Sequence, residues 1–352
     1  MTLILSNIPP VRLDQKNAFS YFEDLLHEAD SLRIASGYIS ADSIAELKNM
    51  FEMNNKSYLE LIIGMHAFDG FTRSQFEAAK YLDDFLRSKN AGEVKVATTF
   101  RFHGKVYSFL KDRAPFAGIL GSSNLASIFD NTNAYEVDLL IKEQPLVTEV
   151  NKFITTLSEK ACTPLHKWEV KKFIESENIR LDGHEGVEKV GKEKLIDMFS
   201  KKSEICFCIP IKGNDSQQKS NLNVYFGKGR ENKKGFVKPR HWYEVELIVP
   251  SSITSSPHYP KAGHFDREKV FTVYTDDGWK FRCNTNGDYS KNFRSSDDLK
   301  ILGRWIKGRL ENAGALKIGE PVTGQTLTKY GRDNFELIGT QDPSIWLLNF
   351  GV

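Results

Sequence analysis

The sequence has 352 residues, of which 40% are hydrophobic, 12% aromatic and 27% charged, and its formal net charge is +2. This length predicts roughly two domains, and the composition excludes disordered and collagen-like chains. No apolar run approaches the roughly 18 residues that a membrane helix needs, and the first ten residues lack the features of a signal peptide. We therefore expect a soluble, cytoplasmic protein.

The net charge conceals a difference between the two halves. Residues 1–180 carry 21 Lys and Arg against 24 Asp and Glu, a net of −3, whereas residues 181–352 carry the other 27 and 22, a net of +5. The second half is therefore the better place for a polyanionic partner. Of the four cysteines, Cys206 and Cys208 lie one residue apart, but no C-x-x-C pair occurs, so we expect neither zinc nor a disulfide framework.

The first half alternates between two kinds of element. Apolar residues at helical spacing predict helices, and short apolar runs predict strands. The predicted order is helix 19–31, strand 31–39, helix 39–53, strand 58–65, helix 71–89, strands 93–100, 104–110, 116–121 and 135–141, and helix 148–162. A β-α-β-α order followed by clustered strands indicates an α/β sandwich.

The second half has a different character. A charged stretch over residues 179–202 predicts a linker with a short helix. Strands dominate after it, over residues 204–211, 222–227, 241–249, 269–275 and 279–283, and one long helix is predicted over 295–314. We predict an α/β domain over residues 1–178 and a mostly-β, barrel-like domain over residues 203–352.

One constellation in the first half indicates chemistry on a phosphate. His103 and Lys105 are two residues apart, so on a strand both side chains project from one face. Lys105 would neutralise oxyanion charge, and His103 would attack phosphorus or protonate a leaving oxygen. The segment GSSN, with Ser122 and Asn124, follows an apolar strand, and its small residues would let backbone N–H groups approach the anion. Glu136 could orient an imidazole.

A structural explanation competes with this interpretation. His103 and Lys105 could be a solvent-exposed pair on an edge strand, and GSSN a simple turn. His66, which follows a predicted strand, is expected to have a structural role, and Tyr38 either lines the site or is buried. The joint order of His103, Lys105, GSSN and Glu136 favours the catalytic interpretation.

This order of residues resembles the HxK…GSxN half-motif of the phospholipase D superfamily, over about residues 30–145. The resemblance implies metal-independent phosphodiester cleavage through a phosphohistidine. The superfamily often has an Asp five residues after the Lys, where this chain has Leu110, so Glu136 is the candidate acid. No second H-x-K occurs among the eight histidines. A working site would therefore need a homodimer, in which one His103 is the nucleophile and the other the acid.

Two polar loops in the second half have the composition of a DNA reader. Residues 212–223 and 282–294 are rich in Asn, Gln, Arg and Lys, the residue types that read base edges in the major groove. The basic segment 227–242 between them is a candidate phosphate-contacting stripe. The alternative is that these are ordinary polar loops.

The second half resembles the plant-type B-three DNA-binding pseudobarrel, which grips the major groove with two loop arms. The resemblance is carried by DDGWKFRC, KNFRSSDD, LGRWIKGRL and LKIGEPVT. Together the two halves resemble NgoFVII-type restriction endonucleases, of which BfiI is one, over nearly the whole chain. That resemblance implies the DNA-binding candidates Gln217, Lys219, Asn221 and Asn223 in the first arm, and Arg282, Asn284, Asn286, Lys291, Asn292 and Arg294 in the second.

The resemblance also implies the partners. We expect a sequence-specific deoxyribonuclease that acts on double-stranded DNA as a homodimer and needs no metal or cofactor for its chemistry. Some relatives depend on an ATP-driven helicase subunit, and this chain has no GxxxxGK[ST] loop, so ATP chemistry would come from a partner. Two alternatives stay open: a phosphodiesterase acting on lipids or other substrates, and a DNA-binding dimer whose nuclease half is inactive.

Overall fold

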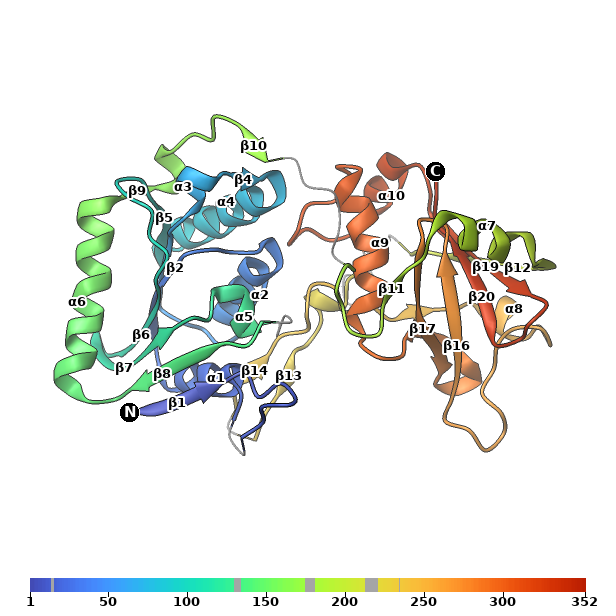
Figure 1. Ribbon diagram of the computed structural model, residues 1–352, viewed down its shortest axis with the longest axis horizontal. Coiled ribbons are helices and arrows are strands. Elements are labelled where there is room, and N and C mark those ends of the chain that lie inside the picture. Colours follow the sequence, from blue (N-terminus) through green and yellow to red (C-terminus); the bar gives the residue numbers. More distant parts are fainter. Residues whose placement is uncertain (14–15, 130–133, 175–180, 213–220, 234) are drawn as a thin grey trace. The chain divides into compact units, whose positions relative to one another are not determined.

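The structure is a computed structural model that describes residues 1–13, 16–129, 134–174, 181–212, 221–233 and 235–352 (Figure 1). The chain forms two compact units. The first comprises residues 1–176 and 229–239, and the second comprises residues 177–228 and 240–352. Among the described residues, no helix is both long and apolar enough to cross a membrane.

The first unit is built on one eight-stranded sheet with the order β1-β8-β7-β6-β2-β3-β5-β9. Its strands are β1 (Thr2–Leu5), β2 (Ser31–Ser36), β3 (Tyr58–Ile63), β5 (Gly92–Ala97), β6 (Lys105–Lys111), β7 (Ala114–Gly121), β8 (Val137–Ile141) and β9 (Cys162–Pro164). Its helices are α1 (Ala18–Glu28), α2 (Ala41–Met53), α3 (His66–Asp69), α4 (Arg73–Ser88), α5 (Leu125–Phe129) and α6 (Gln144–Ala161). A short pair, β4 (Phe71–Thr72) with β10 (Phe173–Ile174), stands apart from this sheet.

Helices cover both faces of this sheet, which confirms the predicted α/β sandwich. Helix α6 lies on one face, whereas α1, α2, α4 and α5 lie on the other (Figure 1). Helix α6 buries Val147, Val150, Ile154 and Leu157 against the sheet, and the spacing of these residues is that of one helical face. Capping boxes fix the starts of α2 and α4.

The directions of the strands bring several chain segments to one edge of the sheet. Strands β2 and β3 are parallel, whereas β6 runs antiparallel to β2 and places Lys105 opposite Ser36. Strand β7 is antiparallel to β6, and its last residue, Gly121, lies opposite Asp138 near the start of β8. The ends of β2, β3 and β7 therefore meet the starts of β6 and β8.

A hairpin from the basic segment of the second half belongs to the first unit. It is formed by β13 (Arg230–Glu231) and β14 (Val237–Lys238). The Asn54 side chain donates to the Val237 carbonyl and accepts from the Val237 N–H, both at 2.9 Å. Phe236 is 1% exposed, and the Lys238 ammonium lies 4.2 Å from the centre of the Phe19 ring. The hairpin is thus packed on the first unit. The sequence had instead predicted this basic segment as a phosphate-contacting stripe between the two polar loops of the second half.

The second unit is mostly β, as predicted, and its main sheet curls into a half-barrel. The strands run in the order β12 (Lys202–Pro210), β19 (Asn334–Thr340), β20 (Ile345–Asn349), β16 (Glu268–Thr275), β17 (Trp279–Asn286), β18 (Asn292–Ser295) and β15 (Leu247–Ile248), and β11 (Glu188–Lys189) also pairs with β17. The helices are α7 (Lys192–Ser200), α8 (Ser251–Thr254), α9 (Lys300–Asn312) and α10 (Gly324–Tyr330). Phe271, Phe293, Phe335 and Trp346 pack in the core.

Two predicted strands of the second half are wrong. Residues 222–227 contain the 3-10 turn Val224–Phe226, and residues 241–249 contribute only the two residues of β15. Trp242 and Tyr243 are fully buried, and both donate to the Glu311 carboxylate on α9, so this stretch packs against that helix. Strands β19 and β20 and helix α10 were not predicted.

Candidate functional site

His103 and Lys105 lie together at the edge where the strands meet. Lys105 is the first residue of β6, and His103 precedes that strand, so only one of the pair is on a strand. The Lys105 Nζ is 3.1 Å from His103 Nε2 and donates to the His103 carbonyl oxygen at 2.7 Å. An ammonium only donates, so it forms a hydrogen bond with Nε2 when that nitrogen carries its lone pair. Lys105 is buried at 6% exposure, whereas His103 is exposed.

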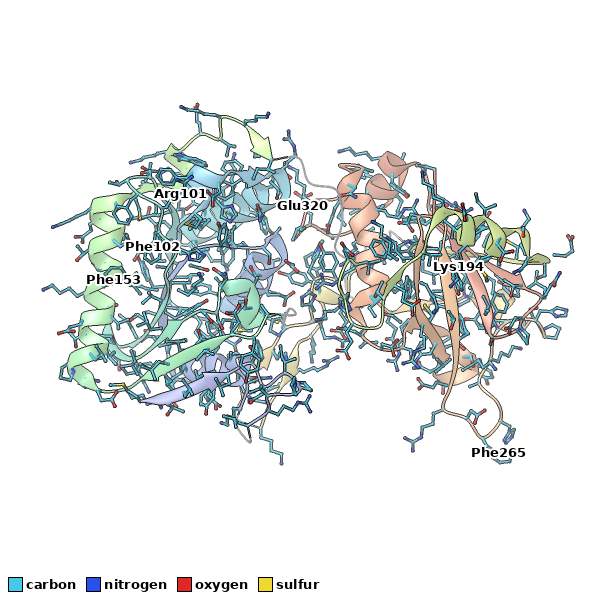
Figure 2. All side chains as sticks on the ribbon, in the orientation of Figure 1. Arg101, Phe102, Phe153, Lys194, Phe265 and Glu320 are labelled. Atoms are coloured by element: carbon cyan, nitrogen blue, oxygen red, sulfur yellow. The ribbon has the colours of Figure 1, made fainter. Side chains whose placement is uncertain are left out.

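Close backbone packing and one buried ring fix the position of His103. A Cβ on Gly64 would lie 2.0 Å from the carbonyl oxygen of Phe102, so only glycine allows this approach. The Phe102 ring is buried and lies 6.1 Å from the ring of Phe153 on α6 (Figure 2). Phe102 is thus anchored in the core, whereas the next residue, His103, is exposed.

Burial and a nearby carboxylate act in opposite directions on Lys105. Its pKa is lowered mainly because burial disfavours the charged ammonium, and the negative charge of Glu136 opposes this decrease. The sequence predicted that His103 and Lys105 lie together and that Glu136 orients an imidazole. The structure brings His103 and Lys105 together, and the charge of Glu136 acts on Lys105. Leu110, at the position where an Asp was considered, is buried within β6.

Within one chain, Glu136 is held by serines. Its Oε2 accepts from Ser122 Oγ at 2.5 Å, and its Oε1 accepts from Ser127 Oγ at 2.8 Å. Ser122 Oγ also accepts from the Val137 N–H at 2.9 Å. Ser122 therefore positions Glu136, and among the described residues no hydrogen bond joins Glu136 to His103. Sequence reasoning missed Ser127, which has no fixed spacing from the other residues.

Asn124 has one end of its amide fixed and the other available. Its Oδ1 accepts from the Tyr38 N–H at 3.0 Å and from Ser36 Oγ at 3.4 Å, which assigns the orientation of the amide. Among the described residues, Nδ2 has no hydrogen-bond partner. Nδ2 is therefore available to donate to an oxyanion, as the sequence predicts.

Two N–H groups of the GSSN segment, those of Ser122 and Ser123, are engaged within the protein, contrary to the expectation that this backbone approaches an anion. The N–H of Ser122 donates to the Val137 carbonyl, that of Ser123 donates to Asp138 Oδ1, and that of Leu125 donates to Ser36 Oγ. Asp138 is 2% exposed and also accepts from Ser123 Oγ. It was missed as a supporting residue, although it stands two positions after Glu136 in the same apolar segment.

Tyr38 links His103 to a neighbouring histidine. The Tyr38 ring contacts the His103 ring edge-on at 5.6 Å and the His66 ring at 5.5 Å. His66 is buried, and its Nδ1 donates to the Gly70 carbonyl at 2.8 Å while its Nε2 accepts from the Ile39 N–H at 3.3 Å. Burial lowers the pKa of His66. These contacts give His66 the structural role that was expected, and they place Tyr38 beside the site.

Most DNA-binding candidates of the second arm share one face of the second unit's sheet. Arg282, Asn284 and Asn286 alternate along β17, with Arg294 opposite Asn284 and Asn292 opposite Asn286 on β18. The intervening Cys283, Thr285 and Phe293 are buried on the other face. A polar network crosses this face: Arg294 Nε donates to Asn284 Oδ1 at 3.3 Å, and the Asn284 amide donates to Glu268.

These candidates differ in how accessible they are. The Arg282 side chain is 59% exposed and forms an ion pair with Asp297, which raises its pKa. Lys291 lies 3.6 Å from Asp288 and is 45% exposed. Asn284 is 3% exposed, so its amide already serves the network described above.

Of the four first-arm candidates, two are buried and two lie outside the described residues. Asn221 accepts from the Ile248 N–H at 3.0 Å, and Asn223 both donates to and accepts from the Val322 backbone, at 2.9 and 2.8 Å. They are 4% and 3% exposed. Gln217 and Lys219 lie outside the part of the chain that the structure describes. The roles of all four in binding stay predictions.

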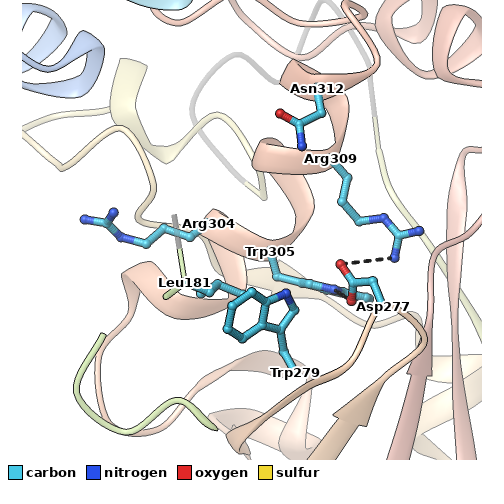
Figure 3. A pocket seen from close by; sticks show the side chains of 7 residues that line it. All are labelled: Leu181, Asp277, Trp279, Arg304, Trp305, Arg309 and Asn312. Atoms are coloured by element: carbon cyan, nitrogen blue, oxygen red, sulfur yellow. Dashed lines mark hydrogen bonds and ion pairs between the residues drawn. The ribbon is translucent and has the colours of Figure 1, made fainter. Parts of the chain in front are cut away.

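Two other clusters in the second unit are less suited to a phosphate or metal. A cavity of about 40 Å³ is lined by Leu181, Asp277, Trp279, Arg304, Trp305, Arg309 and Asn312 (Figure 3). Asp277 accepts from Trp305 Nε1 and lies 3.8 Å from the Arg309 guanidinium. Asp276 and Asp277 thus already neutralise the charge of Arg309.

The second cluster is a possible ligand set for a cation. Cys206, Cys208 and Glu336 place their ligand atoms within 4.8 Å of one another. The Glu336 carboxylate, however, accepts from the Asn349 amide at 2.7 Å and lies 3.5 Å from the Arg332 guanidinium. A cation would have to compete with both of these groups.

Comparison with known proteins assigns both halves of the chain. Residues 15–171 match the NgoFVII restriction endonuclease N-terminal PLD domain, where PLD denotes phospholipase D, and residues 197–341 match the NgoFVII C-terminal B3-like DNA-binding domain. None of the curated proteins matches this chain.

Two solved structures are similar to part of this chain. NucT from Helicobacter pylori is 17% identical over 46% of this chain and 98% of its own, with a TM-score of 0.33. Nuc, a phospholipase D family member from Salmonella typhimurium, is 15% identical over 46% and 95%, also with a TM-score of 0.33. The two family matches are consecutive and together cover most of the sequence. The chain therefore belongs to the NgoFVII restriction endonuclease family, with an N-terminal PLD nuclease domain and a C-terminal B3-like DNA-binding domain.

Proposed function

We propose that this protein is a site-specific restriction endonuclease that cleaves DNA phosphodiesters without a metal, in an active site completed by a second copy of the chain. The observation that carries the proposal is the contact between His103 Nε2 and the Lys105 ammonium at the edge of a PLD nuclease domain. The B3-like domain on the same chain supports DNA as the substrate.

The chain's own residues suggest a two-step reaction. When a scissile phosphate enters, its oxygens replace His103 Nε2 as the hydrogen-bond acceptors of the Lys105 ammonium. This leaves the lone pair of Nε2 free to react. His103 Nε2 attacks phosphorus, so a P–N bond forms while the P–O bond to the leaving oxygen breaks. The leaving oxygen takes a proton from His103 of the partner subunit. That imidazole, now neutral, takes a proton from water as the water attacks phosphorus and breaks the P–N bond.

Lys105 and Asn124 are suited to stabilise the charge that develops on the phosphoryl oxygens. Lys105 supplies a buried ammonium, which acts more strongly there than it would in bulk water. Asn124 supplies Nδ2, whose direction is fixed by the Oδ1 contacts with Tyr38 and Ser36. Glu136, whose carboxylate is held by Ser122 and Ser127, favours the protonated form of Lys105 through its charge.

The need for a homodimer follows from counting imidazoles. In-line displacement requires a nucleophile on one side of phosphorus and an acid on the other. Among the eight histidines of the sequence, His103 alone begins an H-x-K motif. Pairing two chains about a two-fold axis would supply the second imidazole, and the two rings would then titrate as a coupled pair.

The second unit would choose the cleavage site, and a partner would supply any ATP-driven step. The exposed Arg282 and the polar face of β17 and β18 would make contacts with bases and phosphates. The sequence has no GxxxxGK[ST] loop, so an ATP-dependent helicase subunit would have to be a separate chain.

The test is plasmid cleavage in excess EDTA, with and without a candidate helicase and ATP. Cutting at fixed positions in EDTA by the wild type, but not by His103→Ala, is the expected result. Cleavage that needs added metal would refute the histidine mechanism. Specific DNA binding without cutting under every condition would identify a DNA-binding dimer with an inactive nuclease half. Turnover of phospholipid vesicles with no effect on DNA would identify a lipid phosphodiesterase.

The shared site has its own test. Sedimentation should give a dimer, and mixing wild type with increasing amounts of His103→Ala should reduce cleavage in proportion to the loss of wild-type dimers. A fully active monomer would contradict the shared site, even if cleavage in EDTA is confirmed.

A further inference from the structure

The loop over residues 256–267, between α8 and β16, has an exposed aromatic tip. The Phe265 side chain is 96% exposed, and Figure 2 shows it at the end of a projecting loop. A fully exposed phenylalanine gains nothing from folding, since its apolar surface stays in water. An aromatic ring held in water at the tip of a loop is available to contact a partner.

This loop is attached to the second arm. The Ala262 N–H donates to Ser290 Oγ at 3.1 Å, and Tyr259 Oη donates to the Ser290 carbonyl at 3.4 Å. Thr285 Oγ1 on β17 donates to the Pro260 carbonyl. Because Tyr259 is 3% exposed, the base of the loop is part of the packed domain. The loop and the arm around Ser290 therefore form one surface.

The charges near the tip favour a polyanion. Lys261, Arg267 and Lys269 are exposed, and no ion pair involving them occurs among the described residues. Two acids are nearby. Asp266 is exposed, whereas Glu268 accepts a hydrogen bond from the Asn284 amide. The cations outnumber the acids, and one acid already has a partner.

The same end of the sheet carries the second arm's candidates. Glu268, where the loop enters β16, lies opposite Asn286, and Asn286 lies opposite Asn292. The tip of the second arm, Tyr289, is 87% exposed. Exposed aromatic rings therefore end two neighbouring loops on one side of a DNA-binding domain.

We propose that the Phe265 loop, residues 256–267, is a third DNA-contacting element beside the two arms. This rests on the proposed function, in which this unit binds DNA. The Phe265 ring packs against a sugar or base edge of the duplex, and Lys261 and Arg267 contact phosphates. Phosphate contacts contribute affinity for any sequence, so the loop strengthens binding to DNA in general.

The test measures binding of the full-length protein to a labelled duplex pool of mixed sequence, by anisotropy over a range of salt concentrations. Phe265→Ala should weaken binding at least severalfold. Lys261→Ala and Arg267→Ala should each reduce the slope of log affinity against log salt by roughly 0.9. Asp266→Asn should strengthen binding, because it removes a negative charge from a surface that faces phosphates.

Matched controls come from α7 of the same unit. Ile196, which is 71% exposed, and Lys194, which is exposed, supply Ile196→Ala and Lys194→Ala. Both should leave affinity and salt slope unchanged, and thermal unfolding should be the same for all these exposed substitutions. If the wild type binds and the loop variants match the controls, the loop inference is refuted alone. If the wild type does not bind DNA, the proposed function fails as well.

Discussion

The catalytic edge of the first unit and the polar face of the second unit both gather charged and amide side chains, but they do so differently. At the catalytic edge, serines hold Glu136, and Tyr38 and Ser36 fix Asn124 while leaving its Nδ2 available. On the polar face, side chains bind each other across strands, as Arg294, Asn284 and Glu268 do.

The proposed function accounts for this difference. A phosphorus centre has one geometry, so catalysis requires atoms that are held in place before the substrate arrives. DNA presents many phosphates and base edges, and its reader can exchange internal hydrogen bonds for external ones when it binds. The experiments below test that contrast, from the largest expected effect to the smallest.

His103→Ala removes the proposed nucleophile in one chain and the acid in the other. We expect the cleavage rate to fall by roughly 10⁴-fold or more, since each role alone typically contributes 10²–10⁴-fold. DNA affinity should stay unchanged, because the second unit carries the binding surface. The control is Lys152→Ala, at an exposed position on α6. Loss of DNA binding in His103→Ala would show that the two surfaces are not independent.

Glu136→Gln tests the charge that supports Lys105. Burial lowers the pKa of Lys105 and Glu136 opposes that decrease, so removing the carboxylate should lower this pKa further. The ammonium would then lose its proton at a lower pH, and the alkaline limb of the cleavage profile should move to lower pH. The measurement is single-turnover cleavage against pH, with Lys105→Arg as a variant that keeps its charge. A limb that does not move would mean that Glu136 acts in another way.

The sequence predicted the main residues at the catalytic edge and most of those on the polar face of the second unit. It did not predict that Asn221 and Asn223 of the first arm are buried. His103, Lys105, Asn124 and Glu136 occupy short segments with fixed order, and chemistry restricts their types. Their supports were missed because serines such as Ser127 are common in loops and have no characteristic spacing. In the second unit, burial of Trp242 and Tyr243 beneath α9 replaced the predicted strand, since tertiary packing overrides local β propensity.

Asn223→Ala and Asn292→Ala distinguish support from contact within the arms. Asn223 is buried, and both ends of its amide bond the Val322 backbone, so its loss should reduce the free energy of unfolding by about 1–3 kcal/mol. Asn292 is partly exposed at the end of the polar face, so its loss should weaken DNA binding with little effect on stability. Thermal unfolding and anisotropy measure the two effects. Equal losses of stability in both variants would contradict this division.

Arg282→Ala should have the smallest effect, and its sign is informative. The Arg282 guanidinium is paired with Asp297 in the free protein, so binding a phosphate or base must displace or share that carboxylate. Asp297 therefore reduces what the arginine contributes. If Arg282 contacts a phosphate, Arg282→Ala should lower DNA affinity severalfold and reduce the slope of log affinity against log salt by roughly 0.9. If Arg282 reads guanine, the substitution should relax base preference and leave that slope unchanged. Asp297→Asn should do the opposite and strengthen binding, because it leaves the guanidinium free. If both substitutions weaken binding, the ion pair orders the arm for recognition, and the polar face is then preorganised in the same way as the catalytic edge.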